Sequence, residues 1–357
     1  MALFLQKNLL LLFFISIPSK FIYSQTNSDS TTFRYNEVFT QISEIQKLNG
    51  SFKDAVFLTE VAYKPYMKDD NYYFNFITKD AKLIEKYSKG TRLISYRQKD
   101  SLNYILNISL STFMSGEISI RRDSFEIYTL PFIYNFTDPQ GDQDWTNTFV
   151  TKLLGTHKGN CRSLTYLYKI LADELGAKCW LALAPNHIYI RNYSKQIGWY
   201  NTELTSGTFP TDAWIAATGY VNTDAIRSGV YMDTLSNQQS IGLCIMDLAQ
   251  GYIKQTNNYT DSFVLKCCNL VLQYHSVNPE ALLTKAEVLK RMYLKQKEEN
   301  NPTALDTYNE MEQTYITLVK LGYREMPYKV YQKWLKSSKQ DKEKYLNKKV
   351  NAASKKN

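Results

Sequence analysis

The segment from Gly159 to Leu204 constrains the fold most, because its pattern predicts one helix followed by three strands. Gly159-Asn160-Cys161 reads as a corner at which a loop turns into a helix. The helix is then marked by leucines at helical intervals and by a glycine that ends it: Leu164, Leu167, Leu171, Leu175 and Gly176. The strands follow at 178–184, an apolar run, at 187–193, which alternates, and at 199–204. This part of the chain therefore predicts an α+β core.

Three residues in this segment have side chains that together form a nucleophilic catalyst. Cys161 begins the helix, where the dipole and the free N–H groups favour an anion. His187 begins a strand and can accept and return a proton. Glu203, on the next strand, can orient and stabilise the imidazolium. Asn201 shares its strand face with Glu203 and competes for this third role.

The order and context of these residues resemble the transglutaminase-like superfamily of papain-type folds. The matching residues are Gly159-Asn160-Cys161 with the leucine-rich helix, Asn186-His187 at a strand start, and Trp199 four residues before Glu203. The resemblance covers about 145–220 and implies a helix bearing Cys161 packed on an antiparallel sheet. Members commonly carry Asp in the third role, so Glu203 is a departure, and an amide such as Asn201 serves in papain-like relatives.

The flanking regions read as helical. Residues 31–130 predict a mostly helical region, with a helix capped by Asn36, although 100–114 fits a helix and a strand equally. The core is expected at 131–255. Residues 261–346 predict two helical hairpins, whose helices are expected at 261–275, 279–298, 302–321 and 328–345. They are similar to degenerate tetratricopeptide-type repeats, which present concave surfaces to protein partners.

The first residues predict an export signal. Lys7 precedes the apolar run Leu9–Ile17, Pro18 breaks the run, and Ser24 offers a small residue for cleavage. Nine apolar residues are too few to span a bilayer, which needs about 20. We therefore expect a signal peptide at 1–24, a secreted or periplasmic protein, and no stable membrane span.

Charge and cysteine usage exclude some classes of function. The net charge of +9 falls to +7 without Lys7 and Lys20, and much of the rest lies in the lysine-rich end, so we expect a disordered basic tail at 347–357 rather than a nucleic-acid site. Five cysteines is an odd number and Cys267 and Cys268 are adjacent on a predicted helix, so the sequence predicts no disulfide framework. His157, His187 and His275 lack ligand spacing and no Cys-x-x-Cys occurs, so the sequence predicts neither a metal nor a cofactor.

Two functions remain from the sequence. The first is an exported thiol enzyme acting on an amide bond of a peptide or protein, by hydrolysis or by acyl transfer. The second is an inactive binding module on the same scaffold, which uses the C-terminal helices to hold a protein partner. A short distance between the Cys161 sulfur and a His187 ring nitrogen favours the first.

Overall fold

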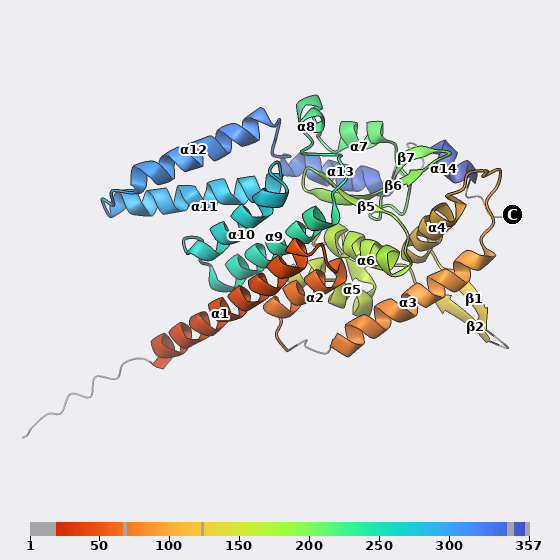
Figure 1. Cartoon of the computed structure of the whole chain (residues 1–357), viewed down its shortest axis with the longest axis horizontal. Helices are drawn as coiled ribbons and strands as arrows, with labels where there is room; N and C mark the ends of the chain where they lie inside the picture. The colour runs from red at the N-terminus through yellow and green to blue at the C-terminus, as the bar shows by residue number, and fades with distance from the viewer. Residues whose placement is uncertain (1–18, 67–69, 123–124, 341–345, 354–357) are drawn as a thin grey trace, which may run out of the picture.

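The computed structural model describes residues 19–66, 70–122, 125–340 and 346–353. Among these described residues helix accounts for 62% and strand for 11%, so the fold is mixed α+β with small sheets set among helices (Figure 1). The α+β expectation is confirmed at this level.

In the described residues, the N-terminal region consists of four helices followed by a β-hairpin. Its elements are α1 (Ser19–Lys47), α2 (Phe52–Tyr63), α3 (Asp70–Gly90), α4 (Ser101–Ser115), β1 (Ile118–Arg122) and β2 (Phe125–Thr129). The expected helix start at Asn36 is wrong, because α1 runs through it and the Asn36 amide donates to the Thr32 carbonyl one turn earlier, at 2.9 Å. The ambiguous segment 100–114 is α4, which packs against the central helix α6.

The centre of the molecule is α6 (Cys161–Glu174), packed on a three-stranded antiparallel sheet. The sheet has the order β5 (Trp180–Ala184), β6 (His187–Ser194), β7 (Gly198–Thr202). Every residue of α6 from Ser163 to Ala172 is buried, because α3, α4 and α5 cover the helix as well as the sheet. Before α6, two short strands form a parallel pair, β3 (Ile133–Tyr134) with β4 (Lys158–Gly159). The helices η1 (Trp145–Thr148) and α5 (Val150–Thr156) lie between these strands in the chain, and β4 is followed directly by α6.

Six helices follow the sheet between 212 and 320, and those from 237 to 298 form a helical layer with the N-terminal helices. The six helices are α7 (Asp212–Thr218), α8 (Thr223–Arg227), α9 (Asn237–Thr256), α10 (Ser262–Tyr274), α11 (Pro279–Glu298) and α12 (Ala304–Lys320). α9 packs against α1, α2 and α10, and α10 packs against α11. The sequence places a domain boundary between 255 and 261, and the buried core is continuous there, since Cys267 and Cys268 of α10 belong to the same core as α9.

The C-terminal end departs most from the predicted arrangement. α11 and α12 form a pair that extends away from the body, but α13 (Tyr328–Gln340) does not complete a second hairpin and lies alongside the sheet instead (Figure 1). Residues Lys348–Ala353 form α14, and Val350 is fully buried against Tyr104 and Tyr200. The expectation of a disordered tail is wrong for these residues, because the apolar side chain of Val350, which lies close to lysines in the sequence, is buried against the rest of the protein.

Three further expectations concern the chain as a whole. Within the ranges that the structure describes, no helix is both long and apolar enough to cross a bilayer. All five cysteines are free thiols. The expected signal peptide, with its apolar run Leu9–Ile17, lies mostly outside the described residues and stays a prediction.

Candidate active site

Cys161 occupies the first position of α6, at a corner fixed by its neighbours. The Asn160 side-chain oxygen accepts the N–H groups of Arg162 at 3.0 Å and Ser163 at 3.3 Å, and the Ser163 hydroxyl accepts the Asn160 N–H at 3.1 Å. This capping box satisfies the neighbouring donors. No hydrogen bond among the described residues occupies the Cys161 N–H, so this donor remains available at the thiol.

Gly159 is required by packing at this corner. A Cβ at this position would overlap the Ser163 hydroxyl, which donates to the Asn147 carbonyl at 2.9 Å. Any larger residue would displace Ser163 from the capping box. Gly159 and Asn160, which the sequence marks as the corner before the helix, are thus the residues that hold Cys161 at the helix start.

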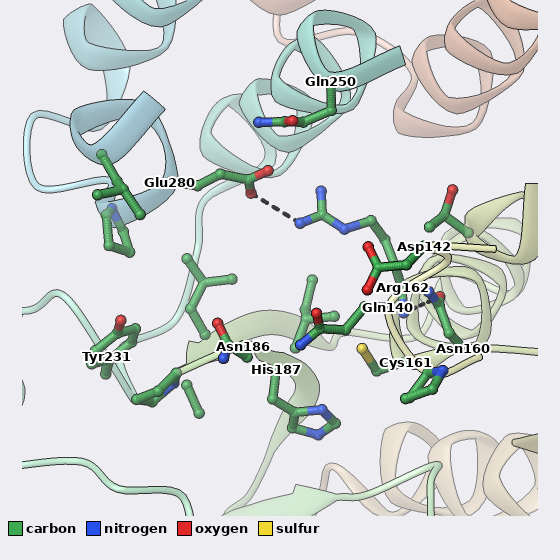
Figure 2. A pocket seen from close by; sticks show the side chains of 18 of the residues that line it. Gln140, Asp142, Asn160, Cys161, Arg162, Asn186, His187, Tyr231, Gln250 and Glu280 are labelled. Carbon is green, nitrogen blue, oxygen red and sulfur yellow. Dashed lines mark hydrogen bonds and ion pairs between the residues drawn. The ribbon is translucent and has the colours of Figure 1, made fainter. Parts of the chain in front are cut away.

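A loop held by Asp138 forms one side of the site. The buried Asp138 carboxylate accepts N–H groups from Asp142 at 2.8 Å, Gln143 at 3.2 Å and Asp144 at 3.0 Å, and the Asn147 amide at 2.8 Å. Burial opposes ionisation, but these hydrogen bonds outweigh it and lower the Asp138 pKa. The ordered loop carries Gln140 to the Cys161 side of the pocket (Figure 2).

His187 and Glu203 form a buried pair beside α6. A two-residue turn joins β5 to β6, with Asn186 in the left-handed region at φ 55°, so His187 is the first residue of its strand, opposite Ala184. Its Nε2 lies 2.6 Å from Glu203 Oε2, and the two side chains are 4% and 2% exposed. The other oxygen, Oε1, accepts the Thr205 N–H at 2.8 Å.

The pair stabilises the charged forms of both side chains. Burial disfavours the imidazolium, but the Glu203 carboxylate and the Cys161 thiol outweigh it and raise the His187 pKa to about 10. Burial likewise disfavours the carboxylate, but His187 and the Thr205 N–H outweigh it and lower the Glu203 pKa. At neutral pH the site therefore holds an imidazolium and a carboxylate.

The remaining ring nitrogen of His187 is available to the thiol. Nδ1 is buried and has no hydrogen-bond partner of ordinary geometry among the described residues, yet Cys161 is close enough to raise the His187 pKa. Cys161 and His187 line the same pocket, as Figure 2 shows. Thiol, imidazole and carboxylate are thus brought together in the predicted order.

Asn201 does not compete with Glu203 for the imidazole. Its amide donates to Asp212 Oδ1 at 2.7 Å and to the Pro210 carbonyl at 3.2 Å. Asp212 also accepts from Arg191 at 3.1 Å, so Asn201 belongs to a separate polar network. Asn201 is corrected from a candidate third member to a residue that ties β7 to the start of α7.

The pocket beside Cys161 has a volume of about 420 Å³ and reaches from the sheet to the helical layer. Arg162 lines it, paired with Asp247 of α9 and, at 2.9 Å, with Glu280 at the first turn of α11 (Figure 2). Sequence reasoning missed Gln140, Arg162 and Glu280. Only the position of Arg162 directly after Cys161 could have signalled a role, since the other two approach from distant segments.

The other histidines and cysteines lie outside this site. His157 stacks on Phe132 at 4.5 Å between ring centres, and His275 is buried beside Asn278. Cys179, Cys244, Cys267 and Cys268 are buried in the core, as expected. In the described ranges no group of His, Cys, Asp and Glu side chains has the arrangement of a metal site.

Comparison of the chain with protein-family models, curated proteins and solved structures finds no match.

The buried pair makes stability depend on pH in a defined window. Because the folded His187 pKa is raised from 6.5 to about 10, its stabilising contribution is complete below pH 6.5 and is lost as the pH rises through 10. The lowered Glu203 pKa adds stability above pH 4.5 that is lost on acidification. We expect the urea midpoint of the wild type to fall between pH 6 and pH 9.5 by more than that of Glu203→Gln. Equal slopes would contradict a charged pair.

Proposed function

We propose that this protein is a cysteine-dependent enzyme of transglutaminase-like type that acts on an amide bond by acyl transfer through Cys161. The observation that carries the proposal is the His187–Glu203 contact of 2.6 Å, with the unpartnered Nδ1 in the same pocket as a thiol at a helix N-terminus. A buried imidazolium held by a carboxylate has the arrangement required to stabilise a thiolate and to protonate a leaving group.

The reaction follows from the available donors. The Cys161 thiolate attacks the amide carbonyl carbon, and the oxyanion that forms is held by the Cys161 N–H and by the Gln140 amide, which faces the same part of the pocket (Figure 2). His187 Nδ1–H gives its proton to the departing amine nitrogen as the C–N bond breaks. In the second half, water or an amine attacks the thioester, His187 takes the proton, and the thiolate leaves.

The substrate class is a peptide or protein, and its acyl acceptor is water in hydrolysis or an amine in transfer. The export signal expected at 1–24 makes the compartment of this reaction the periplasm or the exterior. Support for the transglutaminase-like type comes from the positions of the three residues: Cys161 at the start of α6, His187 at the start of β6 and Glu203 just after β7.

One observation favours the alternative of a protein-binding module without catalysis. The extended α11–α12 pair exposes apolar side chains to solvent, among them Leu294, Leu305 and Val319. Such a surface suits a protein partner, and it is compatible with an enzyme as well. The reactivity of Cys161 separates the two functions.

Alkylation of the native protein with iodoacetamide tests the proposal. We expect one equivalent of label, on Cys161, because burial raises the pKa of Cys179 and Cys268 to about 12 and those of Cys244 and Cys267 well above the ordinary value. Peptide mapping locates the label, and Cys161→Ala should take up none. A peptide library then reveals turnover by the wild type alone. Absence of labelling at Cys161, or uniform labelling of all five, would favour the binding module.

A further inference from the structure

The His187 imidazole is covered by a residue that follows the helical hairpin in the chain. Trp334, on α13, has its ring centre 4.5 Å from that of His187, with the ring planes inclined by 57°. The indole is 5% exposed and packs, with Trp214 and Met326, around a small apolar space that touches both His187 and Glu203. The chemical consequence is that apolar groups close the ion pair where Trp334 covers it.

α13 is anchored on both sides of this contact. One turn before Trp334, the Tyr331 hydroxyl lies 3.4 Å from the Tyr134 hydroxyl, and Tyr134 pairs with Gly159, two residues before Cys161. After Trp334, the side chains of Leu335 and Ser338 on the same helix are buried. Farther along, the Asn347 N–H donates to the Phe209 carbonyl at 2.8 Å. The indole is therefore held against the imidazole by contacts of its own segment.

We propose that Trp334 is a positioning residue for catalysis: it fixes the plane of the His187 ring and keeps water from the His187–Glu203 contact. This inference depends on the proposed function for its effect on turnover, and on geometry alone for its effect on the imidazole. Trp334 does not line the pocket beside Cys161, so it acts through His187 and not on the substrate.

Two opposing effects set the charge of the His187 ring, its burial and the attraction of Glu203. The carboxylate of Glu203 acts on the imidazolium strongly because no water screens it, and this attraction outweighs the cost of burial. Removing the indole admits water, which weakens both the cost of burial and the attraction of the carboxylate. The His187 pKa then returns toward its ordinary value of 6.5. Other titratable groups bear on this balance from neighbouring elements: Cys161 on α6, Tyr189 on β6, Tyr134 on β3, Tyr331 on α13 and Asp142 in the Asp138 loop.

The test compares Trp334→Ala, Trp334→Leu and Trp334→Phe, with Lys333→Ala as the matched control on the exposed face of the same helix. We expect the His187 titration, followed by NMR of the imidazole, to move down by about one pH unit or more in Trp334→Ala. Leu should give an intermediate shift, and Phe should restore most of the wild-type value. Lys333→Ala should titrate as the wild type. The graded series remains informative if the Ala variant does not fold.

Kinetics supply the second measurement. In Trp334→Ala the alkaline limb of the kcat/KM profile should move to lower pH together with the His187 pKa. The value of kcat should fall about 10- to 100-fold with KM little changed. An unchanged His187 titration in Trp334→Ala and Trp334→Leu, or an equal shift in Lys333→Ala, would overturn the inference. A wild type without turnover would overturn the proposed function, while the NMR titration would still decide the role of Trp334.

Discussion

Glu203→Gln is expected to lower kcat by about 10³- to 10⁴-fold, the loss seen when the carboxylate of a buried catalytic triad becomes an amide. The amide oxygen can still accept from Nε2, but the charge that favours the imidazolium is gone. The His187 pKa should fall from about 10 toward 6.5 or below, because burial then acts on the ring without the carboxylate to oppose it. At pH 7.5 the ring is then neutral and the thiolate loses its counter-ion.

The measurement is a pH profile of kcat/KM combined with NMR titration of His187, in the wild type and in Glu203→Gln. Asn201→Ala is the matched control, because Asn201 lies on the same strand yet donates to Asp212 and Pro210. It should keep the wild-type pH profile, with any loss of stability visible in its thermal melt. If Asn201→Ala shifts the profile and Glu203→Gln does not, the assignment of the third member is reversed.

Cys161→Ala is expected to reduce kcat by about 10⁴-fold or more, to the level that binding and oxyanion donors supply without a nucleophile. Substrate binding should survive, because most of the pocket lining lies on other elements, such as α9 and α11. Cys179→Ala is the control: this thiol is buried near the end of α6 and takes no part in the pocket. Comparable activity in wild type and Cys161→Ala would exclude the thiol mechanism.

The part of the site that could be predicted from the sequence is the part defined by local patterns. The leucine spacing after Cys161 fixes a helix start, and the alternation from His187 onward fixes which side chains share a strand face. Glu203 and Asn201 could not be separated in this way. Their difference depends on the chain after β7, where Glu203 turns toward His187 while Asn201 is held by Asp212.

The remainder depends on contacts between distant segments, which leave no local signal. Asp138 lies in a turn cluster that reads as solvated loop, yet it is buried and organises the side of the pocket that carries Gln140. Trp334 and Val350 lie among lysines, a composition that predicts a solvated end. The positions of α13 and α14 depend on single buried side chains, one aromatic and one aliphatic. The charge pattern of the sequence does not predict that these side chains are buried.

Detection of an acyl-enzyme tests the central claim most directly. Wild-type protein, quenched in acid during turnover of a peptide found by library screening, should show by intact-mass spectrometry an added mass equal to the acyl part of the substrate. Peptide mapping should locate that mass on Cys161, and Cys161→Ala should show none. Turnover that proceeds without any adduct, and at the same rate in Cys161→Ala, would contradict the account.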